Sequence, residues 1–370
     1  MRRRIAEILL LCGLIGFAVK AGQDDIFLDW RPGAATHGIR YVGSDACIKC
    51  HAAQAGQVHT PMAHALEVAP DCRIFNEKAE LTFRNGPYTY TVARDGRQIT
   101  YRISDGKNSI VAPILYCFGQ GEVGQTFLFQ RDNVLYETRV SYFEKLHGLD
   151  FTIGHRPAAP VSLDDALGRA LGGEEPRECF GCHTTGAVQG VELKLDQLRP
   201  GVGCEACHGP GEKHLAAIKA KKFDEPQIFN PGGLGGHELS QVFCGTCHTG
   251  FEQAMLQPGQ GGMNNIRFQP YRMFNSRGHN TNDPRISCLS CHNPHEKLQR
   301  ETAYYDQRCF ACHLKTAQES KTERRSAPPC PVRTEKCVTC HMPKVELPGM
   351  HAGFTDHWIR IVKPNEPTPR

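Results

Sequence analysis

The chain lacks a large excess of charge of one sign. Its 370 residues include 43 Lys and Arg against 39 Asp and Glu, which gives a formal net charge of +4. Proteins that bind nucleic acid carry a basic patch or stripe that neutralises phosphate groups. Because the sequence has no such surplus, we exclude nucleic acid as an expected partner.

The apolar run near the N-terminus is too short to span a bilayer. It extends from Ile5 to Val19, about 15 residues where a membrane helix needs about 20. Three arginines precede the run and a small residue, Ala21, follows it. This order is typical of a secretory signal. We therefore predict that residues 1–21 are a signal peptide and that the protein is exported, to the periplasm or outside the cell.

Cysteine, in contrast, is abundant, because the chain has 18. Fourteen of them fall in seven copies of Cys-x-x-Cys-His, the attachment signature of c-type haem. In this signature two thiols one helical turn apart form covalent bonds to haem, and the adjoining histidine binds iron. We therefore predict seven covalent haem c groups. The attachment pairs are Cys47 and Cys50, Cys179 and Cys182, Cys204 and Cys207, Cys244 and Cys247, Cys288 and Cys291, Cys309 and Cys312, and Cys337 and Cys340.

Other uses of Cys-x-x-Cys explain the pattern less well. A structural zinc site needs four ligands, usually from two such pairs, so seven pairs leave one without a partner. Zinc also gives no reason for a histidine at the next position in every copy. A redox dithiol normally occurs once in a fold, and a disulfide framework requires no histidine at all.

The histidines are numerous enough to provide two axial ligands for every haem. The seven motif histidines are the expected proximal ligands: His51, His183, His208, His248, His292, His313 and His341. Eleven of the 18 His remain. Seven of these lie near a motif or in a turn that can direct them toward an iron, and we predict them as distal ligands: His64, His155, His214, His279, His295, His351 and His357. The other four are interpreted as ordinary surface or core residues: His37, His59, His147 and His237.

The second ligand of the first haem is left open at this point. His64 follows the first motif in the segment HTPMAH, and both Met62 and His59 in that segment are alternatives. Ligation by methionine would raise the reduction potential of that haem.

The motif spacing predicts the fold class and the domains. Seven haems leave roughly 50 residues for each, too few for an ordinary apolar core. We therefore expect a mainly α fold with much irregular loop, a core dominated by haem, and a small antiparallel β insert. The predicted divisions are a signal peptide (1–21), an N-terminal module with one motif (40–175), a six-haem domain (176–361) and a C-terminal tail (362–370).

The insert, at about residues 80–143, has the pattern of antiparallel strands. Apolar and polar residues alternate through 80–103 and again through 125–143. Alternation also predicts that Val134, Tyr136, Val140 and Tyr142 share one face. Hairpin turns are predicted at three dipeptides: Asn85-Gly86, Asp95-Gly96 and Asp132-Asn133.

Three cysteines lie outside both the motifs and the signal: Cys72, Cys117 and Cys330. A disulfide between Cys72 and Cys117 would close a loop around the insert, worth on the order of 3–4 kcal/mol. The alternative is that all three are buried thiols, which behave as small apolar residues. Both interpretations stay open here.

Several motif segments resemble the cytochrome c554-like multihaem cytochromes. The matching segments are YVGSDACIKCH, TPMAHA, CEACHGPGEKH, SCLSCHNPH, CHMPK and HAGFTDHWIR. That group belongs to the wider superfamily of nitrite reductases and hydroxylamine oxidoreductases. The resemblance implies closely spaced haem pairs, mostly bis-histidine iron and electron transfer in the periplasm. This chain departs from it in having seven motifs and a long β insert, and it has no Cys-x-x-Cys-Lys motif.

Electron transfer along a chain of closely packed haems is the favoured function, with no catalytic residue assigned. The expected partners are redox proteins, with an inner-membrane electron donor and self-association as further hypotheses. One alternative is a reductase or oxidase of a small nitrogen or sulfur compound at one five-coordinate haem, where Arg139, Tyr142 and His147 would line the pocket. Another alternative is a polymerising extracellular cytochrome.

Overall fold

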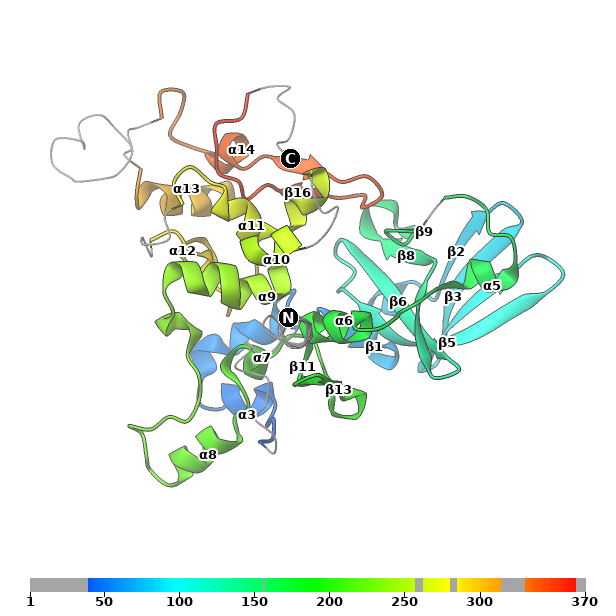
Figure 1. Cartoon of the computed structure of the whole chain (residues 1–370), viewed down its shortest axis with the longest axis horizontal. Helices are drawn as coiled ribbons and strands as arrows, with labels where there is room; N and C mark the ends of the chain where they lie inside the picture. The colour runs from blue at the N-terminus through cyan, green and yellow to red at the C-terminus, as the bar shows by residue number, and fades with distance from the viewer. Residues whose placement is uncertain (1–38, 156, 257–261, 280–284, 314–329, 364–370) are drawn as a thin grey trace, which may run out of the picture.

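The computed structural model describes residues 39–155, 157–256, 262–279, 285–313 and 330–363. The predicted signal peptide, His37 and nearly all of the predicted C-terminal tail lie outside these ranges. Within them, no helix is both long and apolar enough to cross a membrane. The described chain has two regions, a β module and a series of short helices beside it (Figure 1).

The β module is one ten-stranded antiparallel sheet. Its main path runs in the order β10-β7-β6-β5-β4-β3-β2, while β1 pairs with β5, and β8 pairs with β6 and β9. The strands are β1 Leu66–Val68, β2 Glu80–Asn85, β3 Tyr88–Asp95, β4 Gln98–Ser104, β5 Ser109–Phe118, β6 Gly124–Arg131, β7 Val134–Thr138, β8 Val140–Phe143, β9 Gly148–Phe151 and β10 Gly168–Ala170.

The structure has a hairpin turn at each of the three predicted places, but the first two lie one residue further along than predicted. Gly86-Pro87 connects β2 to β3 and Gly96-Arg97 connects β3 to β4, and Gly86 and Gly96 each have φ of 57°. Asp132 and Asn133 have φ of 51° and 62° and connect β6 to β7. Positive φ at both central residues is the type I′ geometry that matches the twist of paired strands, and it favours Asn, Asp and Gly.

The alternating strands give the module an apolar core. Tyr90, Tyr101, Phe127 and Phe129 are each 0% exposed, and they belong to one cluster of buried side chains. The expectation that Val134 shares a face with Val140 and Tyr142 is wrong in part, because Val134 is 39% exposed. The alternation fails because the strand is interrupted at Arg139 and all four residues of β8 are buried.

The helices of the described chain are short. None of those described exceeds nine residues. They are α3 Ser44–Ile48, α4 Ile74–Glu77, α5 Leu163–Leu167, α6 Glu175–His183, α7 Cys204–His208, α8 Glu212–Lys219, α9 Gly245–His248, α10 Phe251–Leu256, α11 Gln269–Phe274, α12 Cys288–Cys291, α13 Thr302–Phe310 and α14 Val338–His341. Among them lie a π-helical turn, η6 Glu238–Cys244, and a 3₁₀ turn, η7 Gly262–Arg267. The described chain also has three two-stranded sheets: β11 Thr184–Thr185 with β14 Arg199–Pro200, β12 Val188–Gln189 with β13 Glu192–Leu193, and β15 Lys344–Glu346 with β16 Gly353–Thr355.

The prediction of a mainly α fold with a small β insert is therefore wrong. Each attachment motif needs only one helical turn, so seven motifs do not produce long helices. The sheet is also larger than the predicted insert at 80–143. It begins at Leu66 in β1 and ends at Ala170 in β10.

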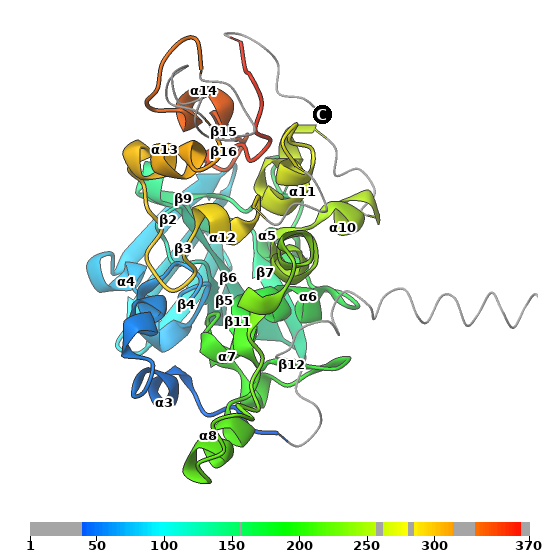
Figure 2. The ribbon, with the colours of Figure 1, turned by 90° about the vertical axis from the view of Figure 1, so that its left-hand side faces the viewer.

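The motif helices form a series beside the β module. Figures 1 and 2 both place α3 and α7 at one end of the series, α9 and α12 in the middle, and α13 and α14 at the other end. The helix α6 lies between this series and the sheet in Figure 1. Ion pairs connect the far end to the module, for example Lys145 to Glu346 at 2.9 Å.

Candidate functional site

Each Cys-x-x-Cys-His motif forms a helical turn. In four motifs the histidine N–H donates to the carbonyl of the first cysteine, at 2.9–3.0 Å, in the i to i−4 pattern of an α-helix. These histidines are His51, His292, His313 and His341. The other three motif histidines end helices α6, α7 and α9. The turn presents two thiols and an imidazole from one short segment.

Several imidazoles are oriented by a hydrogen bond from Nδ1 to a main-chain carbonyl. His183 donates to Ala65 at 2.8 Å, and His208 donates to Phe229 at 2.9 Å. His341 donates in the same way to the carbonyl of Arg360 at 2.9 Å. Such a bond fixes the ring and leaves Nε2 available to a metal, which is the usual arrangement of a ligating histidine.

Three pairs of imidazole rings have the spacing of two ligands on one metal. Two nitrogens each about 2 Å from a metal between them place the ring centres roughly 6 Å apart. Each pair consists of one motif histidine and one predicted distal histidine. The ring-centre distances are 6.3 Å for His51 and His214, 6.1 Å for His208 and His295, and 6.2 Å for His292 and His357. The donor set therefore fits haem iron with two axial imidazoles.

Burial favours the neutral form of three of these imidazoles, as metal ligation requires. Burial, with the neighbouring His292 contributing, lowers the pKa of His357 to about 4. Burial also lowers the pKa of His292 and, together with His208, that of His295. Loss of hydration disfavours the charged imidazolium, so a lone pair remains free for the metal at neutral pH.

The structure places beside the first motif a histidine that was not among the candidates left open for it. The ring that faces His51 belongs to His214, at the start of α8, 163 residues further along the chain. This contact favours His214 over His64, His59 and Met62 for that position. Burial is the main cause of a lowered pKa at His64, with Arg73 contributing.

Three other predicted distal ligands have different neighbours. His155 has a buried side chain with Nε2 3.5 Å from a Glu137 oxygen. His351 places Nε2 2.7 Å from Asp150. His279 lies 5.8 Å, ring to ring, from His237, which the sequence analysis had interpreted as an ordinary residue. With His64, these three stay predictions as ligands. A signal for His237 was its place seven residues before Cys244.

The first cysteines of neighbouring motifs lie close together in space. Thiol-to-thiol hydrogen bonds connect Cys47 to Cys204 and Cys244 to Cys288, and another connects Cys309 to Cys337. The bond from Cys47 lowers the pKa of Cys204 to about 6. Cys207 also lies near Cys244, and Cys291 lies near Cys309.

These contacts order the motifs in space. In sequence order the motifs are numbered one to seven, and their cysteines lie near one another in the order one, three, four, five, six and seven. The second motif lies beside the fourth, because Cys182 Sγ is 3.8 Å from the Thr246 carbonyl. It also adjoins the third, because the Gly203 N–H donates to Thr185 Oγ1 at 2.8 Å. Six motifs therefore form one series, and the second lies beside it.

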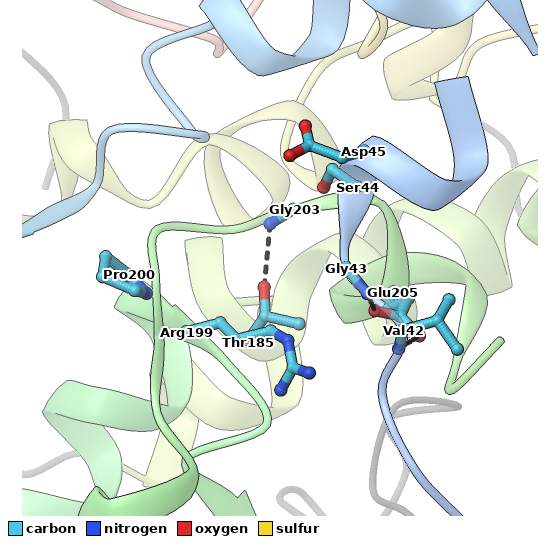
Figure 3. A pocket seen from close by; sticks show the side chains of 9 residues that line it. All are labelled: Val42, Gly43, Ser44, Asp45, Thr185, Arg199, Pro200, Gly203 and Glu205. Carbon is cyan, nitrogen blue, oxygen red and sulfur yellow. Dashed lines mark hydrogen bonds between the residues drawn. The ribbon is translucent and has the colours of Figure 1, made fainter. Parts of the chain in front are cut away.

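A pocket of about 270 Å³ lies where the first and third motifs meet. Figure 3 shows Glu205 and Thr185 among the residues that line it. The Glu205 carboxylate is buried and accepts hydrogen bonds from the N–H groups of Val42, Gly43 and Gly211 at 2.7–2.8 Å. Glu205 therefore ties the segment before the first motif to the helix of the third.

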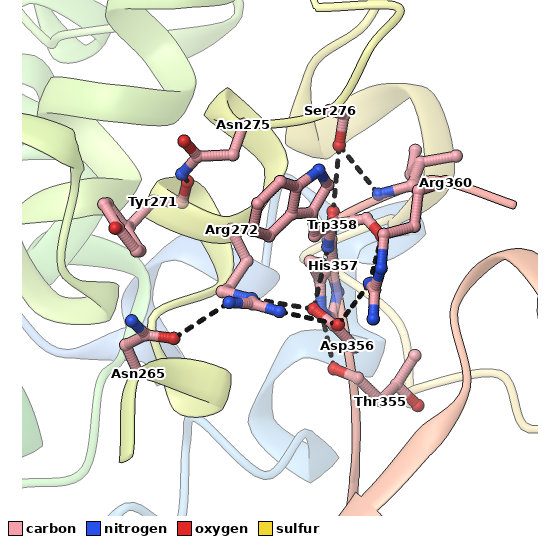
Figure 4. A network of polar contacts seen from close by, with 11 residues as sticks. Asn265, Tyr271, Arg272, Asn275, Ser276, Thr355, Asp356, His357, Trp358 and Arg360 are labelled. Carbon is pink, nitrogen blue, oxygen red and sulfur yellow. Dashed lines mark hydrogen bonds and ion pairs between the residues drawn. The ribbon is translucent and has the colours of Figure 1, made fainter. Parts of the chain in front are cut away.

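A buried polar network encloses His357 near the C-terminal end of the described chain (Figure 4). Arg272 and Asp356, both 0% exposed, form a bidentate ion pair with distances of 2.8 and 2.7 Å. Arg360 adds a second ion pair to Asp356 at 2.6 Å. Although burial raises the pKa of Asp356, the hydrogen bonds from Arg272, Trp358 and Arg360 hold it below the usual value.

Two of the three residues suggested for a substrate pocket in the β module share a partner. The hydroxyl of Tyr142 donates to Glu144, and His147 Nδ1 lies 3.3 Å from the same carboxylate on a side chain that is 70% exposed. Arg139 is buried and donates instead to the Ala158 carbonyl at 2.7 Å. The pocket with all three residues stays a prediction.

The two cysteines of the module are neighbours. Cys72 and Cys117 are each 0% exposed, and a hydrogen bond joins their thiols. Both are free thiols in the structure, and Cys72 also donates to Gln125 at 3.0 Å. Cys330 is exposed, so the alternative of three buried thiols is wrong for that residue.

Parts of the chain are similar to known proteins. The family described as cytochrome c554 and c-prime matches residues 161–209, which contain the second and third motifs. The chain is a multihaem c-type cytochrome. A similar protein is the multiheme cytochrome MtrA of Shewanella baltica (strain OS185), 26% identical over 201 residues, which are 51% of this chain and 50% of the relative. The cytochrome thus spans about half the length of that curated relative. No solved structure matches it.

Proposed function

We propose that this cytochrome is an exported electron carrier with seven covalently attached haems. The paired cysteines of each motif would hold haem, and the motif histidine would be the proximal ligand. Haem supplies reversible one-electron chemistry when bound, with a potential that depends on ligand identity, burial and hydrogen bonding. The spacing of three histidine pairs at 6.1–6.3 Å is the observation that carries the proposal.

The histidine pairs favour electron transfer over catalysis. An imidazole on each side of an iron leaves no position for a substrate. The rings of His208 and His341 are held by main-chain carbonyls, so they need not move when charge changes. A rigid ligand set keeps the reorganisation that accompanies each electron transfer small.

The order of the motifs supports transfer through the protein. The cysteines of all but the second motif lie near one another in one series, and the second adjoins the fourth through Cys182. Such a series gives one entry and one exit region, at the first and seventh motifs, and a third region at the second motif. Redox proteins are the partners that this arrangement would serve.

The predicted signal peptide supports a location in the periplasm or outside the cell. There the cytochrome would receive electrons from a donor at the inner membrane and pass them to a second redox protein. The name of the similar protein from Shewanella baltica, a multiheme cytochrome, agrees with this class of function but does not identify a partner.

One set of spectra tests the proposal. Intact mass and a pyridine haemochrome assay of the purified protein should give seven haems, and five or fewer would contradict the count. The EPR spectrum of the oxidised protein should contain low-spin signals alone. A high-spin signal that disappears on addition of nitrite or hydroxylamine would instead support a reductase or oxidase with one open iron.

A further inference from the structure

The segment from Thr355 to Arg360 lies against the histidines of two different motifs, His292 and His341. His357 lies within it, and its ring centre is 6.2 Å from that of His292 in the fifth motif. The main chain of Arg360 holds His341 of the seventh motif. His341 Nδ1 donates to the Arg360 carbonyl at 2.9 Å, and the Arg360 N–H donates to the His341 carbonyl at 3.2 Å.

Arg272 anchors this segment from a different part of the chain. It lies on α11, 84 residues before Asp356, and its guanidinium binds both oxygens of that carboxylate. A third donor, Nη1, binds the side chain of Asn265 at 3.1 Å. Only a guanidinium presents parallel donors in this geometry, so lysine cannot reproduce the contact.

Asp356 and Trp358 connect Arg272 to the main chain beside both histidines. The Asp356 carboxylate accepts from the Trp358 N–H at 3.0 Å and from Arg360 at 2.6 Å. The centre of the Trp358 ring is 4.9 Å from the guanidinium of Arg272 and 5.5 Å from that of Arg360. Both ends of the segment are therefore fixed to one buried group.

A residue just beyond α11 also binds the main chain of His357. Ser276 Oγ donates to the His357 carbonyl at 3.2 Å and accepts from the Ile359 N–H at 2.8 Å. Ser276 lies two residues after the end of α11, so the segment that carries Arg272 also fixes the main chain on either side of Trp358. Figure 4 shows these contacts converging on Asp356 and His357.

We propose that Arg272 is a positioning residue for two haem irons at once, those of the fifth and seventh motifs. Through Asp356 it fixes His357 as the second ligand of one iron and the Arg360 carbonyl as the orienting group for His341 on the other. This proposal rests on the proposed function, because it requires that His357 and His341 are axial ligands.

The test compares four single variants of the full-length, haem-loaded protein. Arg272→Gln removes the guanidinium, and Arg272→Lys keeps the positive charge but not the parallel N–H donors. His357→Ala removes one ligand directly. Arg94→Gln is the matched control, because Arg94 is a half-buried arginine of the β module with hydrogen bonds to three carbonyls.

The readouts are haem content, low-temperature EPR and titration with imidazole. His357→Ala should convert one iron to a high-spin form that binds added imidazole. Arg272→Gln should affect two of the seven irons, and Arg272→Lys should affect the same two to a smaller extent. Arg94→Gln should keep the wild-type spectrum, because its contacts do not reach a motif.

Each outcome bears on a different claim. If His357→Ala leaves the spectrum unchanged, the ligand assignment fails and the proposal fails with it. If His357→Ala opens one iron but Arg272→Gln opens none, the positioning role alone is wrong. If Arg272→Gln lowers haem content, mass mapping of haem peptides decides: selective loss at Cys288 and Cys337 supports the proposal, and uniform loss overturns it.

Discussion

The β module and the motif series fill their interiors in different ways. The module buries large side chains against one another, with Phe127, Phe129 and Tyr142 each 0% exposed. In the motif series beyond residue 204, the large side chains buried to that degree are Ile266 and Arg272. One of these two is charged, so protein side chains supply little apolar core in the described part of the series.

The two regions therefore differ in what stabilises them. The module has the apolar burial that ordinarily drives folding. The motif series has instead seven helical turns that present cysteine and histidine toward shared spaces. Removing the cofactor should therefore affect the two regions unequally.

The largest expected effect comes from preventing haem attachment. Protein produced where haem is not attached should keep the β module folded and leave the motif series unfolded. Hydrogen exchange read peptide by peptide checks this, because local opening free energies range from about 0 up to the global value of roughly 5–15 kcal/mol. Peptides from β3 to β6 should stay protected, while those around Cys244 and Cys288 should exchange almost freely.

The haem-loaded protein is the control, in which both regions should be protected. Equal protection of both regions without haem would contradict the comparison, because the motif series would then have a core of its own. Equal loss of protection in both regions without haem would show that the stability of the module depends on the motif series.

A substitution inside the module should destabilise the module and leave the haem sites unchanged. Phe129→Ala removes a ring that is 0% exposed and contacts Tyr101 and Tyr136. We expect it to lower the free energy of unfolding by about 3–5 kcal/mol, measured by far-ultraviolet circular dichroism in denaturant. The visible spectrum should not change. Phe223→Ala, at a side chain that is 66% exposed, is the control and should change neither.

A disulfide between Cys72 and Cys117 should have a somewhat smaller effect on the stability of the same module. Cys72 and Cys117 are buried neighbours, so oxidation in an exported protein would join β5 to the turn after β1. A loop of this length is worth on the order of 3–4 kcal/mol in the chain-entropy model, with less when the bond is strained. A reducing agent should then lower the unfolding midpoint of the module.

Peptide mapping without reduction gives an independent measurement. A tryptic peptide that joins Cys72 to Cys117 supports the bond. If both cysteines become alkylated on denaturation alone, the two are thiols in the mature protein. Cys330 is exposed and should be alkylated without denaturation, which controls for the labelling reaction.

The sequence predicted the local features of the module well. Asp132-Asn133 predicts a hairpin from two residues, and both indeed have positive φ. In contrast, β1 and β10 escaped prediction because each has three residues and no alternation to detect. They exist through distant pairing, for example Leu66 with Phe118 and Gly168 with Thr138.

The sequence predicted part of the candidate site. The motifs specify the proximal histidines because each forms a local turn. Of the predicted distal set, His214, His295 and His357 lie opposite a motif histidine in the structure. Sequence spacing could not show that His351 would lie against Asp150, since the two are 201 residues apart and come from different regions.

The smallest expected effect concerns the contact between the regions. Lys145 of the module and Glu346 of β15 form an ion pair at 2.9 Å, but their side chains are 60% and 75% exposed. Exposed pairs contribute about 0–1 kcal/mol, so Lys145→Gln should change the stability of either region by less than about 1 kcal/mol. Glu122→Gln, which breaks a similar pair with Arg300 at 2.8 Å, should behave in the same way. The measurement is denaturant unfolding followed separately by circular dichroism and by the visible haem spectrum. A large shift in both signals would mean that the module and the motif series fold as one unit, and the comparison between them would fail.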